Sequence, residues 1–200
     1  MKVLLVNGSP HVDGSTNFAL EQVAKSLNEE GIETEIFWIG DEPIGSFSIS
    51  YEYKEDDVVN KFAKKLDSAD GFVFGCPVHY ASAPGNFISF MDRLFSTNKN
   101  PELFRLKPAA AICSARRGGL SATFDEINKY FTISQMPIIS STYWNSIHGN
   151  NKEEAAKDLE GVATMRNLGK NMAYFLKCIE LSKDKIEKPE ITRVKTNFIR

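Results

Sequence analysis

The first seventeen residues constrain the fold more than any other part of the chain. A short apolar run at residues 3–6 leads into a stretch rich in glycine and hydroxyl side chains at residues 7–17, and helical periodicity begins near Ser15. A strand, a loop and a helix in this order direct backbone N–H groups and the positive end of the helix dipole at one point, where an anion can bind. The pattern therefore predicts an α/β fold with a phosphate site after its first strand.

The loop also indicates which phosphate it can hold. A Walker loop requires a lysine after its second glycine, whereas Gly14 is followed here by Ser15 and Thr16. The dinucleotide pattern Gly-x-Gly-x-x-Gly is also absent. The ligand that remains is a terminal monophosphate, which backbone amides and hydroxyls can hold. The alternative is an ordinary strand-to-helix turn in which Ser15 or Thr16 caps the helix.

Composition excludes several classes of protein. The 200 residues, 42% of them hydrophobic, suit one domain or one domain with an appended tail. No apolar run approaches the roughly 20 residues that span a bilayer, and Met1 and Lys2 lead straight into a strand rather than into a signal peptide. A formal net charge of −2 gives no case for nucleic acid. We therefore expect a cytoplasmic protein with no nucleic-acid or membrane partner.

The three cysteines, Cys76, Cys113 and Cys178, form no Cys-x-x-Cys motif. They predict neither a disulfide framework nor a metal site, and we expect them to be buried small side chains in a reducing compartment. No Ser/His/Asp set or carboxylate pair emerges from the sequence, so no catalytic side chain is predicted.

Apolar runs and helical patterns alternate along most of the chain. Strands are predicted at residues 3–6, 32–39, 71–75, 108–113 and 136–144, and helices at 15–30, 56–68, 83–94, 119–131 and 153–183. Strands that alternate with helices form a parallel sheet with helices on both faces. The more polar second strand suits a sheet edge, which favours the flavodoxin-like order 2-1-3-4-5 in a three-layer sandwich. We expect one domain at residues 1–183 and a C-terminal tail at 184–200.

In that order the first and third strands open a crevice at their carboxyl ends. The third strand leads into residues 75–85, where His79 and Tyr80 lie between Pro77 and Pro84 and offer a wall for a flat ring. The fourth strand leads into residues 114–119, which end in two glycines whose N–H groups can donate to a ring carbonyl. The three loops thus predict a phosphate cradle, a stacking wall and a donor rim at one crevice.

Two of these loops carry a family resemblance. The residues Asn7-Gly8-Ser9-Pro10 with Gly14-Ser15-Thr16-Asn17, and Pro77-Val78-His79-Tyr80 before Pro84-Gly85, resemble the NADPH-dependent FMN reductase family. The resemblance extends from residue 2 to about 131 and is nearest to the branch that includes the iron-sulfur flavoproteins. That branch carries a cysteine cluster after its second strand, but residues 43–50 here contain no cysteine. The chain resembles the flavin part without the cluster.

The resemblance implies FMN as cofactor and assigns three groups of contacts. The phosphate would be bound by Ser9, His11, Ser15, Thr16 and Asn17, the ring would be flanked by Pro77, Val78, His79 and Tyr80, and its other edge would be lined by Ser114, Arg116, Gly118 and Gly119. His79 could contact the ring through its side chain or only through its backbone. Arg116 and Arg117 could face the ring, the phosphates of the nicotinamide nucleotide or only water, and His148 receives no role.

The resemblance also implies a reaction. NAD(P)H would serve as co-substrate and reduce FMN, and a small-molecule electron acceptor (a quinone, a nitro or azo compound, a metal ion or free flavin) would then take the electrons in a ping-pong mechanism. A homodimer is expected, as is usual in the family, and the long last helix carries enough apolar surface for it. Two alternatives stay open: an FMN-binding electron carrier or redox sensor without NAD(P)H turnover, because the stretch at 45–53 lacks the cluster, and a non-redox nucleotide-binding domain.

Overall fold

A five-stranded parallel sheet forms the centre of the computed structural model, which describes residues 1–48, 54–97, 100–196 and 198. The strands are β1 (Lys2–Asn7), β2 (Glu33–Trp38), β3 (Gly71–Pro77), β4 (Ala109–Ala115) and β5 (Ser146–His148). Their order is β2-β1-β3-β4-β5 and every neighbouring pair is parallel, which confirms the predicted architecture.

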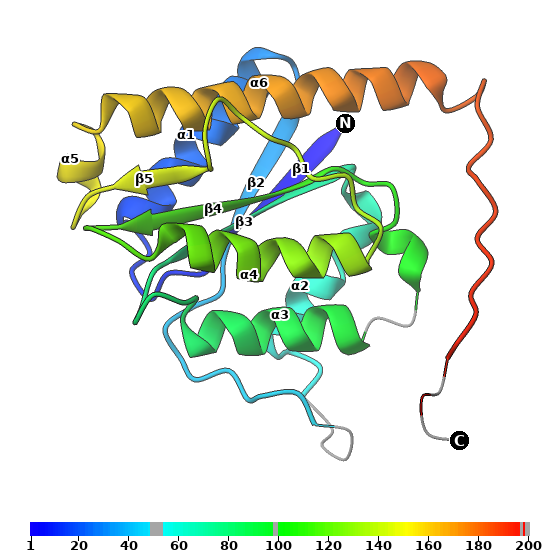
Figure 1. Ribbon diagram of the computed structural model, residues 1–200, viewed down its shortest axis with the longest axis horizontal. Helices are drawn as coiled ribbons and strands as arrows, with labels where there is room; N and C mark the ends of the chain where they lie inside the picture. Colours follow the sequence, from blue (N-terminus) through cyan, green and yellow to red (C-terminus); the bar gives the residue numbers. More distant parts are fainter. Residues whose placement is uncertain (49–53, 98–99, 197, 199–200) are drawn as a thin grey trace.

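Helices cover both faces of the sheet (Figure 1). One face carries α1 (Ser15–Glu29), the short α5 (Lys152–Ala155) and the long α6 (Leu159–Ser182), and the other carries α2 (Val58–Ala63), α3 (Gly85–Thr97) and α4 (Leu120–Ile133). Successive side chains of β1 alternate between the two cores, Val3 and Leu5 toward α1 and α6, and Leu4 and Val6 toward the other layer. Burial on both faces explains why residues 3–6 of β1 and the length of β3 lack polar side chains, whereas the edge strand β2 is only partly buried.

The fifth strand differs from its prediction at residues 136–144. Only Ile138 in that segment makes a bridge, opposite Ala109, and the strand itself pairs at Ser146–His148 with residues 113–115 of β4. Seven residues lie between the two pairings on this segment (139–145) but only three on β4 (110–112), so the intervening chain bulges out of the sheet. The cause is Asn145, which is buried and donates through Nδ2 to the Ala111 carbonyl at 3.0 Å, in the place of a strand residue.

The predicted single helix at 153–183 is two helices. Asp158 interrupts it, because its Oδ1 accepts from the Gly161 N–H at 2.9 Å and caps a new helix, α6. The predicted helix at 56–68 is likewise split, into α2 and a 3₁₀ turn at Leu66–Ser68. Part of the cluster-free stretch at 45–53 lies outside the described residues.

The cysteines follow the prediction only in part. Cys76 and Cys113 are buried and face each other across β3 and β4, and burial together with the hydrogen bond to Cys113 raises the pKa of the Cys76 thiol. The Cys76 thiol therefore stays protonated. Cys178 is exposed, which corrects its expected burial, because it lies on a solvent-facing position of α6.

The C-terminal segment after α6 runs as irregular chain past the edge of the sheet where the strands begin (Figure 1). Arg105 anchors it there by donating a hydrogen bond to the Pro189 carbonyl. None of the helices in the described part of the chain has the length and apolar character needed to cross a bilayer.

Candidate functional site

Three loops meet at the carboxyl ends of the central strands, where the order of the sheet reverses between β1 and β3. A hollow of about 340 Å³ opens between the first and second of these loops and the segment after β2. It is lined by Gly8, Pro10, Gly40, Asp41, Pro43, His79, Pro84, Gly85 and Asn86. Ligands of open parallel sheets bind at this position in the fold.

The loop between β1 and α1 is folded around the start of the helix. Gly8 packs so closely on α3 that a Cβ there would lie 2.2 Å from Phe87 Cδ2. Ser9 is buried, and its Oγ accepts from the His11 N–H at 3.1 Å. Gly14 stands at the N-cap of α1, so the helix has no side-chain cap, and its first turn contains no acidic residue. The first-turn N–H groups are therefore suited to an external anion.

The hydroxyls of the first turn connect this loop to two others. Thr16 is buried, and its Oγ1 lies 2.7 Å from Ser114 Oγ at the end of β4. Ser15 Oγ donates to the Gly149 carbonyl, after β5, at 3.0 Å. Asn17 Nδ2 donates to Glu21 Oε1 at 2.8 Å on the same helix, while His11 is exposed. The structure thus brings the predicted phosphate residues together, with the Ser15 hydroxyl directed to backbone.

An ion pair that the sequence analysis missed lies beside this cradle. Asp13 belongs to the loop itself, and Lys152 Nζ, on α5, lies 2.7 Å from its Oδ1 and 3.5 Å from Glu21 Oε2. The hydrogen bond to Asp13 raises the pKa of Lys152. The pair partly neutralises a carboxylate next to the proposed phosphate position. No sequence signal predicts it, because the two residues are 139 positions apart.

The loop after β3 contains a strained turn. Tyr80 and Ala81 have φ values of 51° and 61°, and His79 and Ser82 exchange two backbone hydrogen bonds of 2.9 and 3.0 Å around them. Both central residues are thus left-handed, as in a type I′ turn, which costs roughly 1–2 kcal/mol per residue with a side chain. Such strain often marks functional sites. The Tyr80 side chain is fully exposed.

Glu126 of α4 holds this turn in place. Its Oε2 accepts from Ser82 Oγ at 2.8 Å and from the Ala83 N–H at 3.0 Å. The sequence analysis missed this residue, because a lone glutamate on a helix is indistinguishable from a solvated surface acid.

The loop after β4 contacts the same turn. Gly119 has a φ of 96°, and a Cβ there would lie 2.8 Å from both Ala81 Cα and Val78 Cγ1. Gly118 faces open space, since an added Cβ would meet no atom within 4 Å. Arg116 and Arg117 are exposed beside them. The predicted ring-binding residues of β3 and β4 therefore lie on adjoining loops.

His148 lies at the end of β5. Its Nδ1 is 3.4 Å from Asp158 Oδ2, and its backbone N–H donates to the same oxygen at 2.7 Å. This contact ties the end of β5 to the start of α6 and explains the position of His148 without a ligand.

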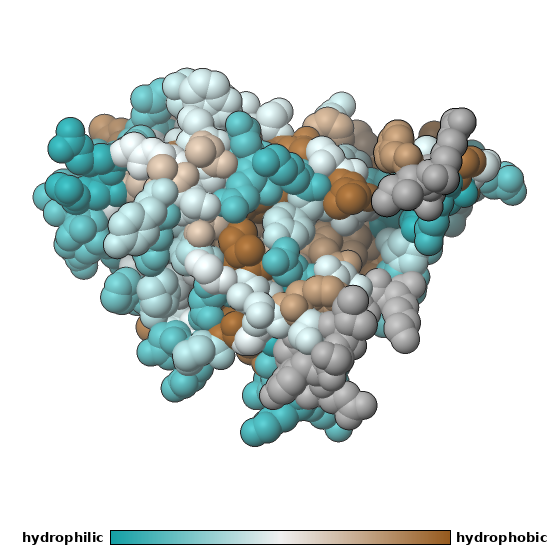
Figure 2. Space-filling model, turned by 60° about the horizontal axis from the view of Figure 1, so that its bottom comes forward, coloured by the Kyte–Doolittle hydropathy of each residue, from teal (hydrophilic) through white to brown (hydrophobic). Residues whose placement is uncertain are grey.

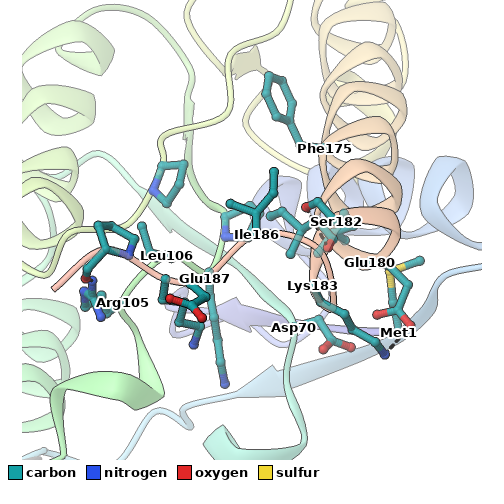
Figure 3. Close-up of a pocket in the computed structure, with 17 residues that line it drawn as sticks. Met1, Asp70, Arg105, Leu106, Phe175, Glu180, Ser182, Lys183, Ile186 and Glu187 are labelled. Atoms are coloured by element: carbon teal, nitrogen blue, oxygen red, sulfur yellow. Dashed lines mark hydrogen bonds and ion pairs between the residues drawn. The ribbon is translucent and has the colours of Figure 1, made fainter.

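A larger hollow, of about 510 Å³, lies at the opposite end of the strands, where they begin, between the end of α6 and the C-terminal segment (Figure 3). Apolar side chains such as Phe175 and Ile186 line it beside charged residues, several of which have partners of their own. Lys183 pairs with Glu180 at 2.5 Å, and Lys107 donates to the Leu66 carbonyl at 3.0 Å. None of the predicted site residues lines it.

Comparison with known proteins agrees with this geometry. The model of the NADPH-dependent FMN reductase family matches residues 1–151. An iron-sulfur flavoprotein of Methanocaldococcus jannaschii is 29% identical over 192 residues, which cover 90% of this chain and 100% of that protein. An FMN-dependent NADPH-azoreductase of Staphylococcus aureus is 26% identical over 56% of this chain and 59% of its own length.

Solved structures show the same fold at low identity. RosB, solved with bound 8-demethyl-8-formylriboflavin-5'-phosphate, superposes with a TM-score of 0.72 at 13% identity and covers 100% of this chain and 93% of its own. A WrbA-like flavodoxin from Agrobacterium tumefaciens gives a TM-score of 0.64 at 15% identity, covering 88% of this chain and 98% of its own.

Proposed function

This chain belongs to the NADPH-dependent FMN reductase family, an oxidoreductase family with FMN as cofactor and NADPH as co-substrate, and we propose that it passes electrons from NADPH to a small-molecule acceptor. The acceptor class we propose is a quinone, a nitro or azo compound, a metal ion or free flavin. Membership of this family sets aside the non-redox nucleotide-binding alternative.

The observation that carries the proposal is the start of α1, where an uncapped helix N-terminus without a first-turn acid meets the buried hydroxyls of Ser9 and Thr16. A phosphate monoester fits this set of donors. We propose that Ser9, His11, Ser15, Thr16 and Asn17 bind the FMN phosphate. His11 is exposed and Ser15 donates elsewhere, so we assign their contacts to the backbone N–H groups.

The two adjoining loops fit the ring end of the cofactor. An added Cβ at Gly118 would meet no atom within 4 Å and the Tyr80 side chain is exposed, so both loops present open surface to a flat ring. We propose that Pro77, Val78, His79 and Tyr80 flank the ring and that Ser114, Arg116, Gly118 and Gly119 line its other edge. Backbone N–H groups of the glycines would donate there and stabilise negative charge.

The protein's part in the reaction is then binding and orientation, without a catalytic side chain. When bound, FMN supplies the redox chemistry, accepting a hydride from NADPH and releasing electrons to the acceptor in what we propose is a ping-pong order. The rigid turn held by Glu126 fixes one wall of the site, and the contact of Gly119 with that turn fixes the distance between the two walls. We also propose that residues 1–183 form the FMN domain and that 184–200 are a tail.

The test is anaerobic reduction. The purified protein is saturated with FMN, NADPH and then NADH are added, and the visible absorbance of the oxidised flavin is followed. We expect NADPH to bleach it. Flavin that binds and stays oxidised would contradict the proposal and favour the electron carrier or redox sensor instead.

A second experiment tests the ping-pong order. Initial rates at several NADPH and acceptor concentrations should give parallel double-reciprocal lines, and intersecting lines would contradict that order.

We propose further that the protein is a cytoplasmic homodimer. Exposed apolar side chains recur along α6, where Leu159, Tyr174 and Leu181 are 77%, 66% and 73% exposed. Figure 2 shows other apolar patches, separated by polar side chains, on a different view of the surface. Apolar surface of this kind is typical of an interface. Sedimentation at micromolar concentration should give a dimer, and a single monomer peak would contradict this proposal.

A further inference from the structure

A second hollow adjoins the loop after β4. Its volume is about 230 Å³, and it lies between the start of α4 and the bulge that precedes β5. Its lining includes Arg117, Gly118, Gly119, Tyr143, Trp144 and His148. Gly118 and Gly119 belong both to this hollow and to the proposed flavin edge, so a ligand here can extend to the flavin.

The bulge displays two aromatic rings at this hollow. Tyr143 and Trp144 are 56% and 54% exposed, and their ring centroids lie 4.8 Å apart at 66°. Ser141 Oγ fixes the bulge, lying 2.6 Å from Asn145 Oδ1 and 2.8 Å from the Tyr143 carbonyl oxygen and donating its single hydrogen to one of the two. The buried Asn145 anchors it to β4. Solvent-exposed indole and phenol rings held in this way are a platform on which a purine base can stack.

The polar part of the hollow suits a phosphate. Arg117 is exposed, and none of the residues that line the hollow carries a carboxylate. Asp158, which contacts the lining residue His148, is not itself part of the lining. Ser121 and Ser146 contribute hydroxyls to the lining. A guanidinium presents several N–H donors in a planar fork that matches phosphate oxygens.

We propose that this hollow binds the adenosine 2′-phosphate half of NADPH, with Trp144 and Tyr143 against the adenine and Arg117 on the 2′-phosphate. The inference rests on the proposed function and extends it, because it names the residues that distinguish NADPH from NADH. The two nucleotides differ only in the 2′-phosphate, so its charge partner sets the preference.

The test is the Arg117→Gln variant, with Lys129→Gln as the matched control because Lys129 is an exposed cation on α4, the helix that follows Arg117, and lies outside the hollow. Loss of a charged hydrogen-bonding partner should raise the KM for NADPH about tenfold. The KM for NADH should change less than twofold. Adenosine 2′,5′-bisphosphate, titrated calorimetrically into the FMN-loaded protein, should bind about tenfold more weakly to this variant, with adenosine 5′-monophosphate unaffected. Lys129→Gln should behave as wild type.

A second variant, Trp144→Ala, separates base from phosphate recognition. It should weaken the bisphosphate and the monophosphate alike, and it should leave the sedimentation coefficient unchanged. Equal effects of Arg117→Gln on NADPH and NADH, or no binding of the bisphosphate to wild type, would overturn the inference. A change of oligomeric state in Trp144→Ala would also overturn it and assign the rings to a subunit contact. The titration needs no turnover, so it tests the hollow even if NADPH fails to reduce the flavin.

Discussion

Replacing Gly119 with alanine is expected to lower the free energy of unfolding by about 2–4 kcal/mol. Two costs add up: alanine would have to adopt a left-handed backbone conformation, and its methyl would overpack a close contact. The φ of 96° disfavours any side chain, and the new methyl would lie 2.8 Å from Ala81 Cα and Val78 Cγ1. Backbone atoms cannot yield as a flexible side chain can. The β3 and β4 loops should therefore be forced apart, and FMN affinity should fall with stability. Urea unfolding of the FMN-free protein and fluorescence titration of FMN measure the two effects.

Gly118 supplies the control. Its φ is outside the left-handed region and an added Cβ meets open space, so Gly118→Ala should keep the urea midpoint or raise it slightly. Equal stability of the Gly119→Ala variant and wild type would show that the two loops do not constrain each other. The control refers to stability only, because Gly118 is also proposed to line the flavin edge.

Replacing Thr16 with valine is expected to weaken FMN binding about 10- to 100-fold, the loss of one hydrogen bond to a charged group. Thr16 is 2% exposed at the uncapped start of α1, and valine keeps its shape while removing the hydroxyl. If Ser114 donates in their 2.7 Å contact, the Thr16 hydrogen is free to donate to the phosphate. Quenching of FMN fluorescence on binding gives the dissociation constant for each variant.

Thr16→Ser is the matched variant for this prediction. It retains the hydroxyl and should bind FMN within about threefold of wild type, because only a methyl is lost. Thr16→Val with unchanged FMN affinity and unchanged stability would remove Thr16 from the phosphate site. A Ser114→Ala variant distinguishes a direct contact between Thr16 and the phosphate from one that Ser114 makes in its place.

The order of the sheet could be predicted from the sequence because it depends on local patterns. Runs of apolar residues mark β1 and β3 as buried on both faces, and the alternation in β2 marks an edge. The site loops followed from this order, since parallel strands place their carboxyl ends together. The positions of the loops at Ser9, His79 and Gly119 are therefore predictable from the strand order alone.

The features that could not be predicted depend on contacts between distant residues. The apolar residues around Ile138 resemble a strand, yet pairing with β4 resumes only at Ser146, because Asn145 takes the place of a strand residue. The break at Asp158 was missed because a capping aspartate resembles any other acid in a helical pattern. Glu126 and Lys152 gain their roles only through partners on other elements.

The partners of the first loop also determine when this protein can acquire its cofactor during synthesis. Asp13 and Ser15 leave the ribosome well before Gly149 and Lys152, the residues that hold them, have been translated. Until then the proposed phosphate cradle has an unneutralised carboxylate and an untethered first turn. If this loop binds the FMN phosphate as proposed, we expect the cofactor to load only after residues 149–152 have been synthesised, because a nascent chain that stops before Gly149 has the glycine-rich loop without the contacts that hold it.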